Sequence, residues 1–142
     1  MSQWTHVSGS IRIDGFPQMG IVPNLRALLG TPSTDAFQWD GNGKWVEAKD
    51  IPSGSEGSIQ WKDIRAGDGL VYVTVAVWGD LRDFGSADTP EIDAWFEKIV
   101  TAAGEKALIR AAHLLVEVEG GSRYVLVATD GKVSRIEVPS ND

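Results

Sequence analysis

Polar and apolar residues alternate along several stretches of the chain, and this period of two predicts β-strands. In Trp4–Ile13, the odd-numbered residues, Thr5 to Ile13, face one side of the strand. The even-numbered residues, Trp4 to Arg12, face the other. Leu70–Trp78 is the most apolar stretch, so we expect it to be the central strand with its valines in the core. Ile59–Ile64 precedes it and predicts a strand that pairs with it through a glycine-rich turn.

The last third of the chain predicts three more strands. Leu108–Glu119 alternates over most of its length and ends at a Gly-Gly turn. Tyr124–Thr129 and Lys132–Val138 flank Asp130-Gly131, a dipeptide that favours a two-residue hairpin turn. We therefore expect a hairpin at the C-terminal end.

Two helices are expected between these strands. Pro23–Gly30 carries leucines at helical spacing and ends at a glycine followed by Thr-Pro, which suits a helix C-terminus. The second helix begins at Asp88-Thr89-Pro90-Glu91, where Asp88 or Thr89 can cap, and ends at Gly104.

The predicted order is strand, helix, strand, strand, helix, strand and hairpin. This order is typical of a ferredoxin-like βαββαβ sandwich, an α+β fold, here with an added C-terminal β-hairpin. We expect a single domain over residues 1–142, with both helices on one sheet face and the other face open. We expect residues 31–57 to be a long connection, with a small hairpin turned at Asn42-Gly43.

Composition narrows the function classes. The chain of 142 residues has a formal net charge of −7, which opposes binding to a nucleic acid polymer or an anionic membrane. It has no cysteine, so disulfides, zinc–thiolate sites and cysteine nucleophiles are excluded. No secretory signal, membrane-spanning segment, metal triad or cofactor motif can be read from the spacing, and we expect a cytoplasmic protein without a metal or cofactor.

The open sheet face is the first candidate site. The first strand would display Trp4 and His6 there, and Leu70–Trp78 would add Tyr72 and Trp78. Aromatic side chains on an open sheet can stack a base or another ring. The more common arrangement is that such a face is covered by the C-terminal hairpin, the long connection or a second subunit.

Two short stretches form a second candidate. The run Ser53, Gly54, Ser55, Glu56, Gly57 and Ser58 can direct backbone N–H groups at an anion, although it can equally be a flexible connection. The group Asp80, Arg82 and Asp83 can hold an anion through its arginine, or can be a self-contained ion cluster. The two ends of a hairpin lie at one edge of the sheet, so we expect these stretches to be neighbours.

Catalytic patterns are few. The chain has two histidines, His6 and His113, and alternation places both away from the expected core face. An alternative function is therefore a phosphodiesterase-like hydrolase, in which one histidine acts as the general acid and the other as the general base.

Three strings carry a resemblance: Trp4-Thr5-His6, then Pro52-Ser53-Gly54-Ser55-Glu56-Gly57-Ser58, then Trp78-Gly79-Asp80-Leu81-Arg82-Asp83. Over roughly Trp4 to Val118 the chain resembles a group of small uncharacterised tailed-bacteriophage proteins. The resemblance implies a phage origin and action in the cytoplasm of the host bacterium. Small phage accessory proteins without enzymatic motifs commonly counter host defence, by binding a defence protein or by trapping a nucleotide signal.

The sequence as a whole favours a non-enzymatic binding protein that forms a homo-oligomer. Its partner would be a small anionic ligand of nucleotide type or a host defence protein. For the ligand, Arg82 would be the anion partner, the Ser53–Ser58 backbone the cradle, and Trp4 or Trp78 the stacking surface. A structural or assembly protein that uses the open sheet face as its interface is a further alternative.

Overall fold

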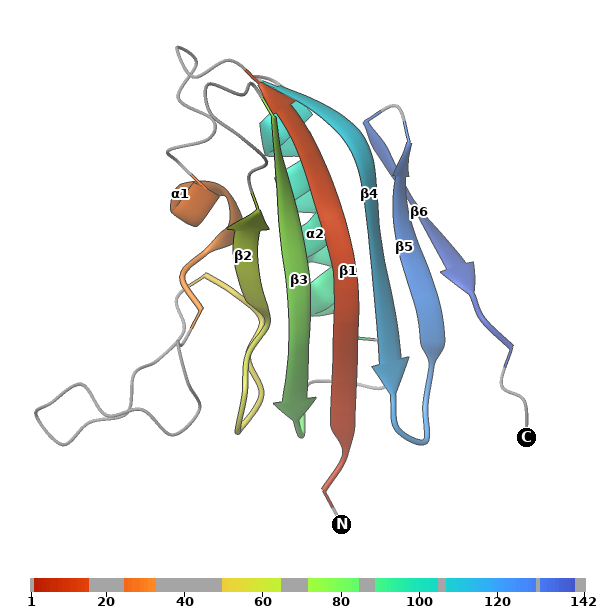
Figure 1. The fold of residues 1–142 in the computed structure, drawn as a ribbon. Helices are drawn as coiled ribbons and strands as arrows, with labels where there is room; N and C mark the ends of the chain where they lie inside the picture. Colours follow the sequence, from red (N-terminus) through yellow and green to blue (C-terminus); the bar gives the residue numbers. More distant parts are fainter. Residues whose placement is uncertain are drawn as a thin grey trace, which may run out of the picture.

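The computed structural model describes residues 2–15, 25–32, 50–64, 72–84, 89–104, 107–129 and 131–139. These residues form an α+β fold in which one open antiparallel sheet carries two helices (Figure 1). The helices are α1 (Leu25–Leu29) and α2 (Pro90–Gly104). The strands are β1 (Trp4–Gly15), β2 (Gln60–Ile64), β3 (Tyr72–Arg82), β4 (Ala107–Val118), β5 (Arg123–Thr129) and β6 (Lys132–Glu137).

The six strands lie in the order β2-β3-β1-β4-β5-β6, and each pair of neighbours is antiparallel. β1 and β4 take the two middle places. The prediction that Leu70–Trp78 forms the central strand is therefore wrong: β3 is an interior strand, one place from the edge strand β2. The cause is the C-terminal hairpin, which widens the sheet on the β4 side only.

The predicted C-terminal hairpin is confirmed, and it extends the sheet. β5 pairs with β4, and β6 pairs with β5 through direct partners Thr129 and Lys132. Gly131 has a φ of 76°, a backbone conformation that favours glycine in such a turn. The resulting order differs from that of a four-stranded ferredoxin-like sheet, so the structure supports the broader class of an α+β fold with an open antiparallel sheet.

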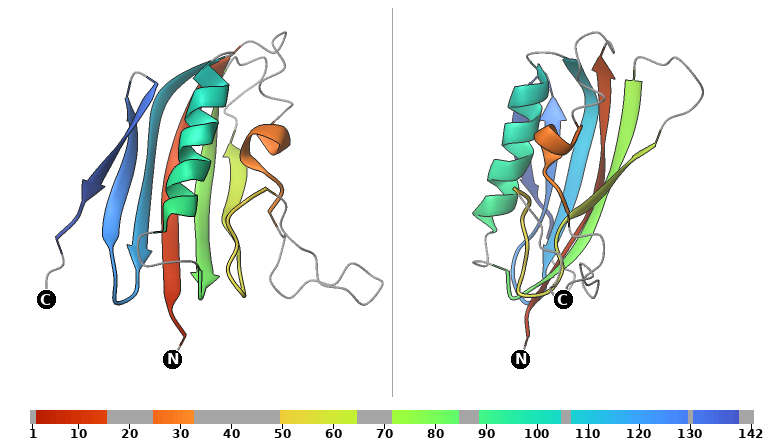
Figure 2. Two further views of the ribbon diagram at one scale, coloured as in Figure 1. Left: turned by 180° about the vertical axis from the view of Figure 1, so that it is seen from behind. Right: turned by 90° about the vertical axis from the view of Figure 1, so that its left-hand side faces the viewer.

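Alternation sorts the two sheet faces as predicted. The core face holds fully buried side chains from neighbouring strands, among them Ile11 of β1, Val75 of β3 and Leu114 of β4. Branched apolar side chains pack well on a pleated surface, which explains their concentration on these strands. Helix α2 covers this face, whereas neither of the described helices lies on the other one, which we call the open face (Figure 2).

Helix α2 confirms the second predicted helix and supplies the other half of the core. Ile92, Phe96 and Ile99 are fully buried at helical spacing. Acidic residues in the first turn, Glu91 and Asp93, suit the positive end of the helix dipole. The carbonyl of Thr89 accepts the first bond, from the N–H of Ile92 at 3.1 Å, while the alternative cap Asp88 lies outside the described residues.

Helix α1 is short, and two tryptophans secure its C-terminal end. Gly30, with a φ of 97°, ends the helix as predicted and donates its N–H to the carbonyl of Arg26. The indole N–H of Trp95 donates to the carbonyl of Leu29, and that of Trp61 donates to the carbonyl of Gly30, each at 2.8 Å. Carbonyls that the helix leaves without partners are thus satisfied.

A buried polar network joins the hairpin to α2. The hydroxyl of Tyr124 lies 2.6 Å from the hydroxyl of Thr89 and donates to Asp93 at 2.6 Å. Arg135 of β6 lies 3.6 Å from the centre of the Tyr124 ring and pairs with Asp93 at 2.9 Å. Burial, followed by the hydrogen bond to Asp93, raises the pKa of the Tyr124 phenol, so the hydroxyl remains a donor.

The hairpin predicted at Asn42-Gly43 lies outside the described residues, as does the turn predicted between Ile64 and Leu70. In the part of the chain that the structure describes, neither helix combines the length and apolar character needed to span a bilayer.

Candidate functional site

The Ser53–Ser58 run forms a turn that packs on the end of β3. Ser53 and Ser58 face each other in an antiparallel bridge, and the N–H of Ser55 donates to the carbonyl of Arg82 at 2.8 Å. The N–H of Arg82 donates back to the carbonyl of Glu56 at 2.9 Å. The prediction that Ser53–Ser58 and Asp80–Asp83 are neighbours is confirmed.

Two glycines make this close contact possible. Gly57 has a φ of 75°, and a Cβ placed there would collide with the carbonyl oxygen of Asp80. Gly79 lies in β3 where a Cβ would meet the carbonyl oxygen of Ser58. Gly79–Arg82 also continues β3 opposite Trp4–Val7 of β1, so the strand runs past Trp78, where the predicted strand ended.

The predicted anion cradle is weakened by the bonds within the turn. The N–H of Gly54 donates to the carbonyl of Gly57 at 2.9 Å, and the N–H of Ser55 is held by Arg82. The hydroxyl of Ser55 also donates to the carbonyl of Arg82. Donors that an anion would need here already have acceptors within the protein.

Arg82, the predicted anion partner, belongs to an ion cluster. Its Nη1 donates to Glu56 Oε1 at 2.7 Å, and its Nε lies 3.7 Å from Asp83 Oδ2 and donates to the hydroxyl of Ser2 at 2.9 Å. Two carboxylates therefore balance this guanidinium. Because the groups are partly exposed, the pairs contribute at most about 1 kcal/mol each to stability.

His6 lies between two carboxylates on the open face. Its Nδ1 is 2.6 Å from Asp80 Oδ1, and its Nε2 is 3.1 Å from Glu119 Oε1. An ionised carboxylate only accepts hydrogen bonds, so satisfying both contacts requires a proton on each ring nitrogen. The hydrogen bond to Asp80, with a smaller contribution from Glu119, raises the pKa of His6 and favours the imidazolium.

A shallow hollow of about 300 Å³ opens beside this cluster. Glu56 and Asp80 contribute carboxylates, and Gly57 and Gly79 also line it. Trp4 and Trp78 both line it and lie four residues apart in register, because Trp4 is opposite Arg82 and Trp78 is opposite Ser8. We call it the tryptophan hollow. The other residues lining it are Ser58 and Gln60.

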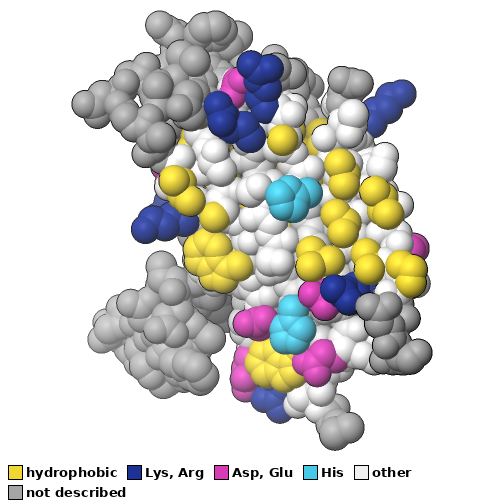
Figure 3. All heavy atoms as spheres, turned by 45° about the vertical axis from the view of Figure 1, so that its right-hand side comes forward, with side chains coloured by type: hydrophobic (Ala, Val, Ile, Leu, Met, Phe, Trp, Pro, Cys, Tyr) yellow, Lys and Arg dark blue, Asp and Glu magenta, His cyan; other side chains and the backbone are white. Residues whose placement is uncertain are grey.

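The structure does not bring the two histidines together. His113 is opposite Ser10, four residues along β1 from His6, which corresponds to about 13 Å at roughly 3.3 Å per residue. Figure 3 shows the two histidine side chains apart on the same face. A shared proton transfer needs hydrogen-bond reach or a single bridging water, so the two-histidine hydrolase is not supported.

Glu119 and Gln60 are site residues that sequence reasoning missed. Glu119 follows β4 and reaches His6 because β1 lies between β3 and β4, a relation that depends on the order of the sheet. Gln60 lines the tryptophan hollow because it is the direct partner of Trp78 in the pairing of β2 with β3. Among the described residues, no group of three His, Cys, Asp or Glu side chains is arranged to hold a metal ion.

Comparisons of the chain with protein-family models, with curated proteins and with solved structures found no match. The chemistry of the site therefore rests on its own residues.

Proposed function

We propose that this chain is a non-enzymatic binding protein whose tryptophan hollow holds a positively charged side chain of a partner protein. The observation that carries the proposal is that two indole rings and two carboxylates line one hollow. An indole face attracts a cation, and a carboxylate binds a guanidinium through paired hydrogen bonds. Arginine combines both modes in one planar group.

The charge of the surroundings favours the same class of partner. The ion pairs around the hollow involve five carboxylates against three cationic groups, so this end of the sheet is negative even when His6 is protonated. An anionic ligand would have to displace Glu56 and Asp83 from Arg82. Of the two partners that the sequence predicts, a host protein is thus favoured over a nucleotide-type signal.

The resemblance to small phage proteins supplies the biological setting of the proposal. Blocking a host defence protein in the cytoplasm of the infected bacterium would be the counter-defence role. A structural or assembly role is the second candidate, and it is supported by the open face, on which no described helix or strand packs.

At the level of fold, we propose that β1–β4 with the two helices derive from a ferredoxin-like unit. The run β2-β3-β1-β4, antiparallel throughout, supports this origin. In this view the hairpin is an addition at the β4 edge.

A titration with defined probes tests the binding proposal. The probes are a capped tri-arginine peptide, a capped tri-glutamate peptide, and linear and cyclic nucleotides, and the readout is the indole N–H signals in NMR spectra. We expect tri-arginine alone to shift the signals of Trp4 and Trp78, assigned with single Trp→Phe variants, and salt to weaken the effect.

Arg82→Ala separates the two kinds of ligand. Removing this guanidinium leaves Glu56 and Asp83 unbalanced, so binding of tri-arginine should tighten. If Arg82 were an anion partner, the same variant would instead abolish nucleotide binding. Nucleotide binding that Arg82→Ala abolishes, with no response to tri-arginine, would overturn the proposal.

A further inference from the structure

Four apolar residues lie in one row across the middle of the open face. Trp78 and Leu115 flank Ser8, since both are opposite it, while Leu115 is opposite Val125 and Val125 is opposite Ile136. The β2 position of this row is Gln60, opposite Trp78. Trp78 is 45% exposed and Ile136 is 54% exposed. We call these four residues the apolar band. Of the three covers that the sequence left open, the C-terminal hairpin is ruled out, since it extends the sheet.

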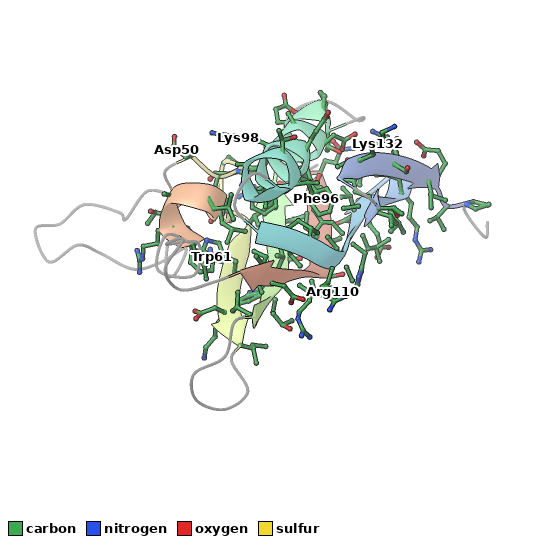
Figure 4. The ribbon with its side chains drawn as sticks, turned by 90° about the horizontal axis from the view of Figure 1, so that it is seen from above. Asp50, Trp61, Phe96, Lys98, Arg110 and Lys132 are labelled. Atoms are coloured by element: carbon green, nitrogen blue, oxygen red, sulfur yellow. The ribbon has the colours of Figure 1, made fainter. Side chains whose placement is uncertain are left out.

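One end of the open face is basic. Arg12 and Arg110 both pair with the carboxylate of Asp14, at 3.2 and 2.6 Å. Arg110 occupies a bulge in the pairing of β4 with β1, and Figure 4 shows it on the side of the sheet away from Phe96 and α2. Lys62 of β2, opposite Ala76, is exposed nearby. These residues form the basic end.

The other end is acidic. His6 of β1 has three acidic residues around it. Its ring contacts Asp80 of β3 and Glu119, which follows β4, and Glu117 of β4 is its direct partner in the pairing of the strands. Figure 3 shows most of the magenta side chains toward the bottom of this face, with dark blue ones beside them, and a dark blue group with one magenta side chain toward the top. The apolar band lies between the two ends, because Ser8, to which it is aligned, lies between His6 and Arg12 in β1.

We propose that the open face binds a second copy of this chain, face to face, about a twofold axis that runs across the strands. Such an axis reverses the strand direction, so the acidic end of each copy meets the basic end of the other. An axis along the strands would place acidic on acidic and is excluded by repulsion. A twofold contact uses one patch twice, and this patch is complementary to itself.

The size of the face suits a stable contact. Five strand spacings of about 4.8 Å, with about 10 residues per long strand at roughly 3.3 Å, give about 800 Å² per copy. A standard interface takes about 800 Å² from each partner. Sheets also pack face to face in sandwiches with an apolar centre, which is the place that the apolar band occupies.

This inference goes beyond the proposed function, because it needs the whole face rather than the tryptophan hollow. The two are linked in one respect: the basic end of a second copy would lie over the acidic end that borders the hollow. A basic partner protein would then compete with self-association.

Light scattering and sedimentation of the full chain test the inference. We expect a dimer that dissociates on dilution and with added salt. Ile136→Lys should raise the dissociation constant by about tenfold or more. Ala94→Lys, which adds the same charge on the exposed side of α2, is the matched control and should leave it unchanged.

A charge swap gives the decisive result, because Arg110 and Glu117 lie on the same strand and meet across the proposed axis. Arg110→Glu alone and Glu117→Arg alone should each be monomeric, and an equimolar mixture should form a heterodimer. Wild-type protein that stays monomeric up to about 1 mM would overturn the inference. So would single variants that dimerise as the wild type does, whatever the outcome of the tri-arginine titration.

Discussion

The imidazole of His6 on β1 and the carboxylate of Asp80 on β3 lie 2.6 Å apart, between Nδ1 and Oδ1. The second ring nitrogen reaches Glu119, which follows β4, at 3.1 Å. One side chain therefore links β1, β3 and the end of β4 at the acidic end of the open face. The link is electrostatic and partly exposed, so it is sensitive to both pH and salt.

The first prediction concerns the pKa of His6. Asp80→Asn should lower it, because the hydrogen bond to Asp80 is the largest effect that raises it. Glu119→Gln, the matched control, should lower it less, since its hydrogen bond contributes less. An NMR titration of the His6 ring measures both. A titration curve that Asp80→Asn leaves unchanged would contradict the assignment.

The same shift fixes the sign of a pH effect on stability. The folded-state pKa of His6 lies above its ordinary value of 6.5, so the stabilisation is fully present below that value. It is lost as the pH rises through the folded-state pKa. Urea unfolding of the wild type should show this decrease, of at most about 1 kcal/mol for a partly exposed pair. Asp80→Asn should show a smaller decrease, because Glu119 alone then raises the pKa of His6.

The second prediction separates backbone strain from crowding at the turn. Gly57 and Gly120 have similar φ angles, 75° and 72°, so alanine is strained to a similar extent at both. A Cβ at Gly120 meets nothing within 4 Å, whereas one at Gly57 collides with the carbonyl oxygen of Asp80. Gly57→Ala should therefore lose about 1–3 kcal/mol more unfolding free energy than Gly120→Ala. Equal losses in denaturant unfolding would show that the turn can move away from β3.

Local patterns predicted the sheet faces and one part of the site. Alternation assigned Val71, Val73, Val75 and Val77 to the core; the last three are buried, and Val71 lies outside the described residues. Hairpin geometry predicted that the Ser53–Ser58 turn and Asp80–Asp83 are neighbours, because both are tied to strands adjacent in sequence.

Relations between distant strands could not be predicted in the same way. Gly79 and Asp80 have poor strand propensity, yet pairing with β1 holds them in β3. The role of Glu119 depends on the position of β1 between β3 and β4. Whether the hairpin covers the open face or widens the sheet depends on the free edge of β4, which no short pattern describes.

The third prediction concerns the network that joins α2 to the hairpin. Tyr124→Phe removes a buried hydroxyl that contacts Thr89 and Asp93, each at 2.6 Å. The groups left behind lose a partner, so the unfolding free energy should fall by about 1–3 kcal/mol. A cycle with Asp93→Asn should show that the two changes are not additive, because they share one hydrogen bond. Additive losses would mean that Asp93 acts mainly through Arg135.

The fourth prediction compares two tryptophans of the same fold. Trp95 is 7% exposed and donates to α1, so Trp95→Ala should lower the unfolding free energy by about 3–5 kcal/mol. Trp78 is 45% exposed on the open face, so Trp78→Ala should lower it far less.

Trp78, which matters less for stability than Trp95, should matter more for tri-arginine binding. Trp78→Ala removes one wall of the tryptophan hollow and should weaken tri-arginine binding, while the fold measured by circular dichroism is kept. Trp78→Phe retains an aromatic face of weaker cation attraction and should fall between the wild type and alanine. If Trp78→Ala binds tri-arginine as the wild type does, the indole is not part of the cation site. Its exposure would then serve only the apolar band, and self-association alone would respond to the change.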